Sequence, residues 1–143
     1  MKFEPGTQEW LDNQYWMHYA EGSLMPPLVM RLVFEKVKTS PMPFFIKPVG
    51  KMIADKVLST FVNPEISLNM GFVEQYLGQH TWFAGDKLSG ADFQMSFPLE
   101  ASVAAGAINH KYPNILAYVK RFQARPGYLN ALEKGGDYDY GPQ

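Results

Sequence analysis

The apolar positions of this chain recur at the spacing of α-helices along almost its whole length. From Thr7 onward, large apolar side chains return every three or four residues, which predicts a helix with Thr7 as its N-cap. Gly22 and Ser23, followed by Pro26 and Pro27, interrupt this pattern. Because proline lacks the amide that a helix interior needs, we expect a kink or a restart here in a long, broken first helix, with Ser23 as a candidate cap for its second segment.

Prolines and turn residues divide the remaining chain into further helices. Residues 40–43, with the sequence Ser-Pro-Met-Pro, predict a turn, after which a helix starts at about Phe44. Asn63, followed by a proline and a glutamate, predicts the N-cap of another helix. Two short helices are expected to open at Pro113 and Pro126, since proline is favoured in the first turn of a helix.

The strongest local pattern surrounds Ser89 and Asp92. A serine followed three residues later by an acid forms a capping box, in which each side chain bonds the backbone amide of the other residue. The helix that follows, from Gly90 to about Ala107, is apolar on most sides, and such a helix belongs at the centre of a bundle. The sequence therefore predicts an all-α fold, a bundle of six or seven helices built around the helix that begins at Ser89.

The composition indicates one folded domain rather than a disordered segment. The 143 residues are 46% hydrophobic and 19% charged, with no low-complexity run or internal repeat. Cysteine is absent, which excludes disulfides, a cysteine nucleophile and thiolate metal sites. His18, His80 and His110 lie far apart in the sequence, so we expect no metal site.

The charge balance bears on the partners and the compartment. Thirteen Lys and Arg against fourteen Asp and Glu give a net charge of −1, whereas binding of nucleic acid or of an anionic membrane usually requires a positive balance. The N-terminus lacks the apolar segment of a secretion signal, and every apolar stretch is too short to cross a bilayer as a helix. We therefore expect a soluble, cytoplasmic protein with no nucleic-acid or membrane partner.

Several of these motifs, in this order, resemble the C-terminal helical domain of cytosolic glutathione S-transferases. The likeness includes residues 83–95 around the capping box, the Tyr-Pro-Asn-Ile run at 112–115 and the Arg-Pro-Gly-Tyr turn at 125–128. Residues 19–27 are similar to the kinked first helix of bacterial and fungal members. The capping box alone is a common pattern, so the resemblance depends on the whole ordered set.

The resemblance implies domain boundaries and an activity. Residues 7–136 match the helical domain, between a leader or linker at 1–6 and a tail at 137–143. Family members begin with a thioredoxin-like domain, which binds glutathione and carries the Tyr, Ser or Cys that activates its thiol. That domain has no counterpart here, so the resemblance implies that this chain holds no catalytic residue and is inactive alone. The longer parent protein would be a homodimeric glutathione transferase for detoxification, with glutathione as co-substrate and no tightly bound cofactor.

The resemblance also implies where a hydrophobic electrophile would bind. In the family, the first helix of the C-terminal domain supplies much of the pocket for this second substrate. The matching helix here carries one broad face with two polar flanks: Tyr15, Tyr19, Gly22 and Pro26, with His18 and Ser23 beside them. We expect these residues to bind the electrophile, and ordinary core packing is the alternative for each of them. Ser89 and Asp92 are implied to stabilise the fold rather than to act in catalysis.

A second hypothesis is a non-catalytic module of the same fold that binds a partner protein. Both hypotheses predict an exposed apolar surface on the first helix, where a thioredoxin-like domain or another partner would dock. They differ because the enzyme requires a glutathione-binding domain upstream in the same protein, whereas the module requires none.

Overall fold

The computed structural model describes residues 3–142, and the regular elements of this part of the chain are all helices. This confirms the predicted all-α fold. A single isolated bridge, between Trp82 and Gly85, is its one β-type contact. The α-helices, in chain order, are α1 (Gln8–Tyr19), α2 (Met25–Thr39), α3 (Lys47–Val57), α4 (Asn63–Leu77), α5 (Gly90–Ala104), α6 (Pro113–Gln123) and α7 (Pro126–Gly135). Two π-helical turns join four of them: η1 (Ala20–Leu24) between α1 and α2, and η2 (Leu58–Val62) between α3 and α4.

The first rod passes through the predicted break as a π-helical turn, so the helix is irregular there but does not restart. Thr7 caps its start as expected, because its side chain accepts a hydrogen bond from the Trp10 amide. At the predicted break, η1 continues the helix, and the residue before α2 is Leu24, which has helical dihedrals and no capping side chain. Ser23 therefore caps nothing. A π-turn shifts the hydrogen-bond register by one residue, which lets the helix continue into the two prolines at 26 and 27 without a break.

The second rod repeats this arrangement. It begins at Lys47 rather than at about Phe44, and it passes through η2 into α4. Asn63 has helical dihedrals, φ −67° and ψ −39°, so it lies inside the rod and is not the predicted N-cap. The hydroxyl of Thr60 donates to the Lys56 carbonyl at 2.6 Å within the widened turn. A π-helical turn precedes the prolines in both rods: η1 precedes residues 26 and 27, and η2 precedes residue 64.

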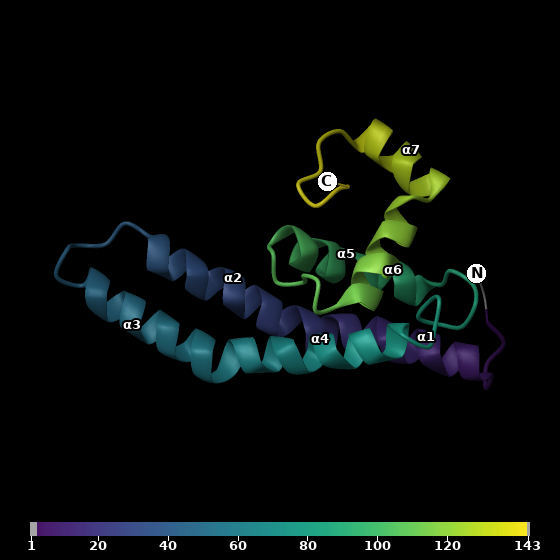
Figure 1. Cartoon of the computed structure of the whole chain (residues 1–143), viewed down its shortest axis with the longest axis horizontal. Helices are drawn as coiled ribbons and strands as arrows, with labels where there is room; N and C mark the ends of the chain where they lie inside the picture. Colours follow the sequence, from purple (N-terminus) through teal and green to yellow (C-terminus); the bar gives the residue numbers. More distant parts are fainter. Residues whose placement is uncertain (1–2, 143) are drawn as a thin grey trace.

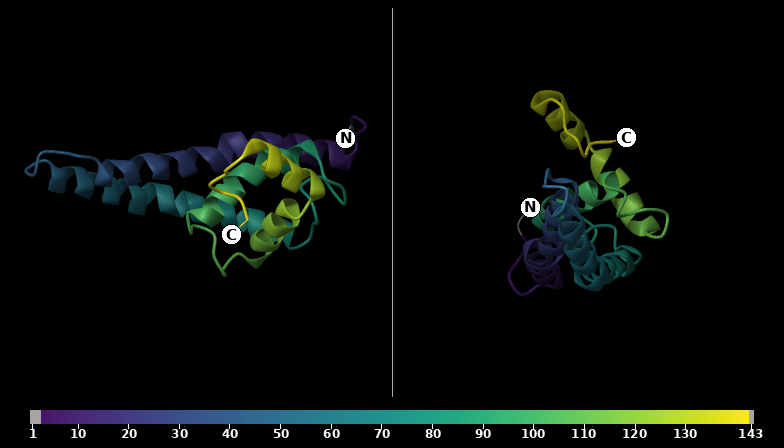
Figure 2. Two further views of the ribbon diagram at one scale, coloured as in Figure 1. Left: turned by 90° about the horizontal axis from the view of Figure 1, so that it is seen from above. Right: turned by 90° about the vertical axis from the view of Figure 1, so that its left-hand side faces the viewer.

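The two rods pack against each other over much of their length, and α2 and α3 project together as an arm (Figure 1). Seen from above, this arm extends well beyond the other helices, and the connection between α2 and α3 forms its far tip (Figure 2). The helices α5, α6 and α7 gather at the other end of the molecule, and α7 stands away from the rods (Figure 1).

Helix α5 lies at the centre of the bundle, as predicted. It packs against α1, α2 and α6. Its inward side chains Ala91, Met95 and Leu99 have no exposed surface. The capping box is present, and α5 begins directly after Ser89. The core around it is aromatic as well as aliphatic, and its largest fully buried side chains include Trp16, Tyr118, Phe83, Leu24 and Met70.

Candidate functional site

The two predicted tyrosines of α1 form one aromatic face. The rings of Tyr15 and Tyr19 stack with centroids 5.8 Å apart and an angle of 26° between their planes. Phe72 of α4 completes the cluster, with centroids 6.5 Å from Tyr15 and 5.5 Å from Tyr19. Tyr15 is 51% exposed. The face therefore spans both rods and is partly exposed to solvent at Tyr15.

A short polar chain fixes the position of Tyr19. Its hydroxyl donates to Oδ1 of Asn69, and the Asn69 amide donates in turn to the carbonyl and carboxylate of Glu65, at 2.8 and 3.2 Å. Burial, followed by the neighbouring Tyr15 and Glu65, raises the pKa of Tyr19 to about 12. At neutral pH this hydroxyl is therefore a hydrogen-bond donor and not a base. Sequence analysis missed Asn69, although a polar residue among the apolar positions of α4 was a visible signal.

The other four predicted site residues lie on the surface of the first rod. His18, Gly22, Ser23 and Pro26 are all exposed. A Cβ built on Gly22 meets no atom within 4 Å, so the space beside this glycine is open. The structure thus brings Tyr15 and Tyr19 into contact, while a binding role for all six residues stays a prediction.

Two contacts tie this rod to the central helix. Oδ1 of Asn13 accepts a hydrogen bond from the Ala91 amide at 3.0 Å and so caps the first turn of α5 from another helix. In η1, two residues after Tyr19, the Glu21 carboxylate accepts a hydrogen bond from the Gln94 amide at 2.5 Å. These contacts fix the position of the first rod relative to α5.

Asp92 joins three segments at the start of α5. Its carboxylate accepts bonds from the Ser89 amide and hydroxyl, both at 2.7 Å, and from the Phe83 amide at 3.0 Å. The Tyr118 hydroxyl of α6 lies 3.3 Å away. Burial raises the pKa of Asp92, while these hydrogen bonds oppose the shift. Since every partner is a backbone group or an interior side chain, the arrangement stabilises the fold.

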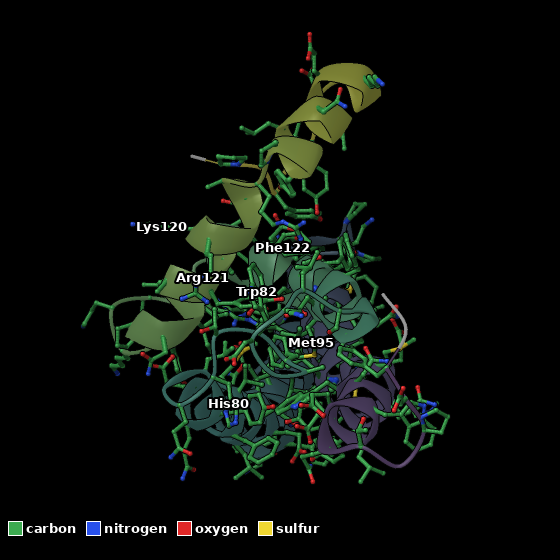
Figure 3. The ribbon with its side chains drawn as sticks, turned by 90° about the vertical axis from the view of Figure 1, so that its right-hand side faces the viewer. His80, Trp82, Met95, Lys120, Arg121 and Phe122 are labelled. Atoms are coloured by element: carbon green, nitrogen blue, oxygen red, sulfur yellow. The ribbon has the colours of Figure 1, made fainter. Side chains whose placement is uncertain are left out.

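A cation–π cluster holds the loop that precedes α5. The guanidinium carbons of Arg121 and Arg125 lie 5.6 and 5.8 Å from the Trp82 ring centroid. Arg121 also donates to the Thr81 carbonyl at 2.6 Å. Figure 3 shows Trp82 beside Arg121, with His80 two residues earlier in the chain. This cluster connects α6 to the loop and brings no reactive group together.

A hollow with a volume of about 530 Å³ lies between α5, α6, α7 and the C-terminal tail. Its walls are mainly aromatic and aliphatic, including Phe93, Phe122, Tyr128, Leu132 and Tyr138. Glu100 is its polar centre: this carboxylate is 3% exposed and accepts from the Tyr128 hydroxyl at 2.6 Å and from Gln123 at 2.9 Å. Burial, followed by the Glu100 carboxylate, raises the pKa of Tyr128.

Two absences hold for residues 3–142. No group of three or more histidine or acidic side chains is placed to hold a metal ion in this part of the chain. No helix there combines the length and the apolarity that crossing a membrane requires.

Comparison with known proteins identifies relatives that are similar in sequence to most of this chain. A family model described as "Glutathione S-transferase, C-terminal domain" matches residues 42–126. Glutathione S-transferase 1 of Saccharomyces cerevisiae is 36% identical over 122 residues, which is 84% of this chain and 52% of that protein. Glutathione S-transferase 3 of Schizosaccharomyces pombe is 28% identical over 124 residues, 87% of this chain and 51% of that protein. The chain spans about half the length of the curated relatives it matches.

Solved structures give the same result for the fold. A crystal structure of a glutathione S-transferase from Actinobacillus pleuropneumoniae superposes with a TM-score of 0.72 at 26% identity, over 98% of this chain and 57% of that one. A glutathione transferase from Phanerochaete chrysosporium, solved in complex with oxidized glutathione, superposes with a TM-score of 0.68 at 18% identity, over 94% of this chain and 57% of that one. At this lower identity the second likeness concerns the fold.

Proposed function

This chain belongs to the glutathione S-transferase family, within which it matches the C-terminal domain, and we propose that it forms the electrophile-binding half of a glutathione-conjugating enzyme. The family match over residues 42–126 is the observation that carries this proposal. The relatives named glutathione S-transferase are about twice as long as the matched segment. We assign the glutathione site and the thiol-activating residue to a thioredoxin-like domain of the same polypeptide, upstream of residues 1–6.

The chemistry divides between the two domains. The upstream domain binds glutathione and favours loss of its thiol proton, and the thiolate then attacks the electrophile, forms a C–S bond and displaces the leaving group. This chain contributes position: it holds the electrophile near the thiolate, so that the encounter becomes effectively intramolecular. The stacked rings of Tyr15 and Tyr19 supply the apolar surface, and His18, Gly22, Ser23 and Pro26 border it.

The aromatic face of α1 suits this role better than the hollow around Glu100. Glutathione carries carboxylates and reacts as a thiolate, so a buried carboxylate beside the reacting atoms would repel it. Glu100 is such a carboxylate, whereas the face of α1 presents neutral rings and the protonated hydroxyl of Tyr19. The first rod is therefore the site we assign.

Exposed apolar side chains of α1 and α5 support docking of the upstream domain on these helices. Met17 of α1 is 37% exposed, and Phe93 and Phe97 of α5 are 62% and 44% exposed. Exposed apolar groups of this size on adjacent helices are typical of surfaces that another domain covers. The family resemblance further supports a homodimer in the cytoplasm that serves detoxification.

The native protein gives the decisive test. We would recover it from its source cells with an antibody against this domain, measure its intact mass and pass it over immobilised glutathione. We expect a mass well above the 16.2 kDa of this chain, retention on the resin and conjugation of an aryl halide to glutathione. The chain expressed alone is the control and should neither bind nor conjugate.

The opposite result would favour the interaction module. A native mass of 16.2 kDa, together with no retention on glutathione, would contradict the enzyme. The same antibody would then recover a partner protein rather than an activity.

A further inference from the structure

The arm formed by α2 and α3 has a charge opposite to that of the rest of the molecule. Residues 25–60 hold six of the 13 Lys and Arg but only two of the 14 Asp and Glu, a net charge of +4. The remaining residues hold seven basic and twelve acidic side chains, a net charge of −5. The whole-chain value of −1 argued against a membrane partner, but it conceals this separation.

The tip of the arm carries large apolar side chains that are exposed to solvent. Phe44 is 87% exposed, Phe45 is 66% exposed and Ile46 is 45% exposed. The two phenylalanine rings contact each other edge to face at 5.5 Å. Behind them, Val49, Met52 and Ile53 continue the exposed apolar surface along α3, at 50%, 65% and 53%. Exposed aromatic rings at the end of a projecting hairpin do not stabilise the fold, because they leave their apolar surface in water.

Basic residues surround this apolar tip. Lys47 follows Ile46 directly, Lys51 lies one turn further along α3, and Lys36 lies on the last turn of α2; all three are exposed. The two ion pairs within residues 3–142 both use Lys38, which bonds Glu35 and Asp55 at 3.3 and 2.9 Å. The other basic groups of the arm are therefore available to an external anion.

We propose that the tip, defined as Phe44, Phe45 and Ile46 with Lys47 and Lys51, docks on the surface of an anionic phospholipid bilayer. Aromatic and aliphatic side chains enter the boundary between headgroups and acyl chains, while lysines beside them attract anionic headgroups. The arm projects beyond the bundle, so that its tip reaches a flat surface before the acidic remainder does (Figures 1 and 2). The protein would bind at the surface only, since no helix of residues 3–142 qualifies as a span.

Charge argues against a second copy that docks tip to tip. Two copies meeting through their tips would bring together two arms of net charge +4, which repel each other. A protein partner would need a concave acidic surface to enclose a convex tip, whereas a bilayer accepts a wedge without a preformed groove. The proposal does not depend on glutathione chemistry.

Vesicle flotation tests the proposal with the native polypeptide that carries this chain. Vesicles of phosphatidylcholine with phosphatidylserine would be compared with vesicles of phosphatidylcholine alone, at low and at high salt. We expect binding to the anionic vesicles only, weakened by salt because screening reduces the attraction of surface charges. The double variant Phe44→Ser/Phe45→Ser should lose about tenfold or more of this binding, through the lost apolar insertion. Lys47→Gln/Lys51→Gln should lose a similar factor, through the lost attraction to headgroups.

Matched controls separate the tip from general effects. Phe61→Ser/Leu68→Ser removes two exposed apolar residues outside the tip, and Lys111→Gln/Lys134→Gln removes two exposed lysines outside the arm. Both controls should bind anionic vesicles like the native protein, and circular dichroism should show all four variants folded. Failure to bind anionic vesicles at low salt would overturn the proposal. It would also be overturned by equal binding to neutral vesicles, or by tip-dependent binding of a soluble acidic protein without vesicle binding.

Discussion

Single polar side chains connect segments of this bundle that are distant in sequence. Asp92 binds the loop at Phe83, its own cap at Ser89 and helix α6 at Tyr118. Asn69 binds Tyr19 across fifty positions, and Asn13 caps α5 across seventy-eight. Each of these side chains makes its hydrogen bonds only when both segments are in place. Removing one leaves its partners without a hydrogen bond, which lowers the free energy of unfolding.

Replacing Asp92 by alanine should destabilise the fold strongly. The substitution leaves the amides of Phe83 and Ser89 without their acceptor, and each unsatisfied buried donor costs about 1–3 kcal/mol. The Tyr118 hydroxyl keeps its bond to the backbone carbonyl of residue 92. We expect the free energy of unfolding to fall by about 3 kcal/mol, measured by urea denaturation. Asp86→Ala, in the exposed part of the same loop, is the control and should change it little. An equal effect of both substitutions would contradict the central role of Asp92.

Replacing Tyr19 by phenylalanine should give a pH-dependent loss of stability. The variant leaves the Asn69 oxygen unsatisfied, and Asn69 is 6% exposed, so we expect a cost of about 1 kcal/mol at neutral pH. The pKa of Tyr19 rises from 10.0 to about 12 on folding, so the folded state keeps the proton longer. The advantage of the native protein should therefore be complete below pH 10 and should decline as the pH rises from 10 to 12.

Denaturation at a series of alkaline pH values measures this difference. Tyr15→Phe is the matched control, because Tyr15 belongs to the same face but is 51% exposed. Its difference from the native protein should be small. A stability difference for Tyr19→Phe that grows between pH 10 and 12 would contradict the assignment.

At the scale of helices, local sequence patterns predicted some starts but not the continuations through η1 and η2. Thr7 and the Ser89 capping box mark true beginnings of helices, because no helical turn precedes either residue. Asn63 has the same local pattern but lies inside a rod, since η2 carries the helix through. Tertiary packing of Leu58 and Val62, both buried, favours the continuous helix over a local cap. A local pattern contains no information about that packing.

This difference predicts unequal costs for two substitutions that the sequence alone would treat alike. Thr7→Ala removes a side chain that accepts the Trp10 amide, so it should cost about 1 kcal/mol. Asn63→Ala replaces an exposed residue within a helix, where alanine has the better propensity, so it should cost nothing or stabilise by a few tenths, about 0.3 kcal/mol. Thermal unfolding of the two variants measures the contrast. A cost of Asn63→Ala as large as that of Thr7→Ala would restore the N-cap interpretation.

At the scale of the whole molecule, the family and the bundle were predictable, but its two surface features were not. The ordered motifs from residue 83 to 128 identified the fold, because they depend on local caps and turns. The hollow around Glu100 forms from α5, α6, α7 and the tail, which no local pattern brings together. The charged arm was concealed because a net charge sums over the chain and ignores where the hairpin places each group.

The tail shows how the last residues complete the bundle, and it supports a final prediction. The carbonyl of Tyr140 accepts a bond from Gln123 at 3.3 Å, its ring packs against Phe97 at 5.8 Å, and Tyr138 lines the hollow around Glu100. Truncation after Gly136 should leave the helices intact but uncover Phe97 and open the hollow. A neutral solvatochromic dye should then bind more strongly, because more apolar surface is accessible. Truncation after Tyr140 keeps these contacts and is the control. Equal dye binding by both truncated proteins would mean that the tail does not cover this surface in solution.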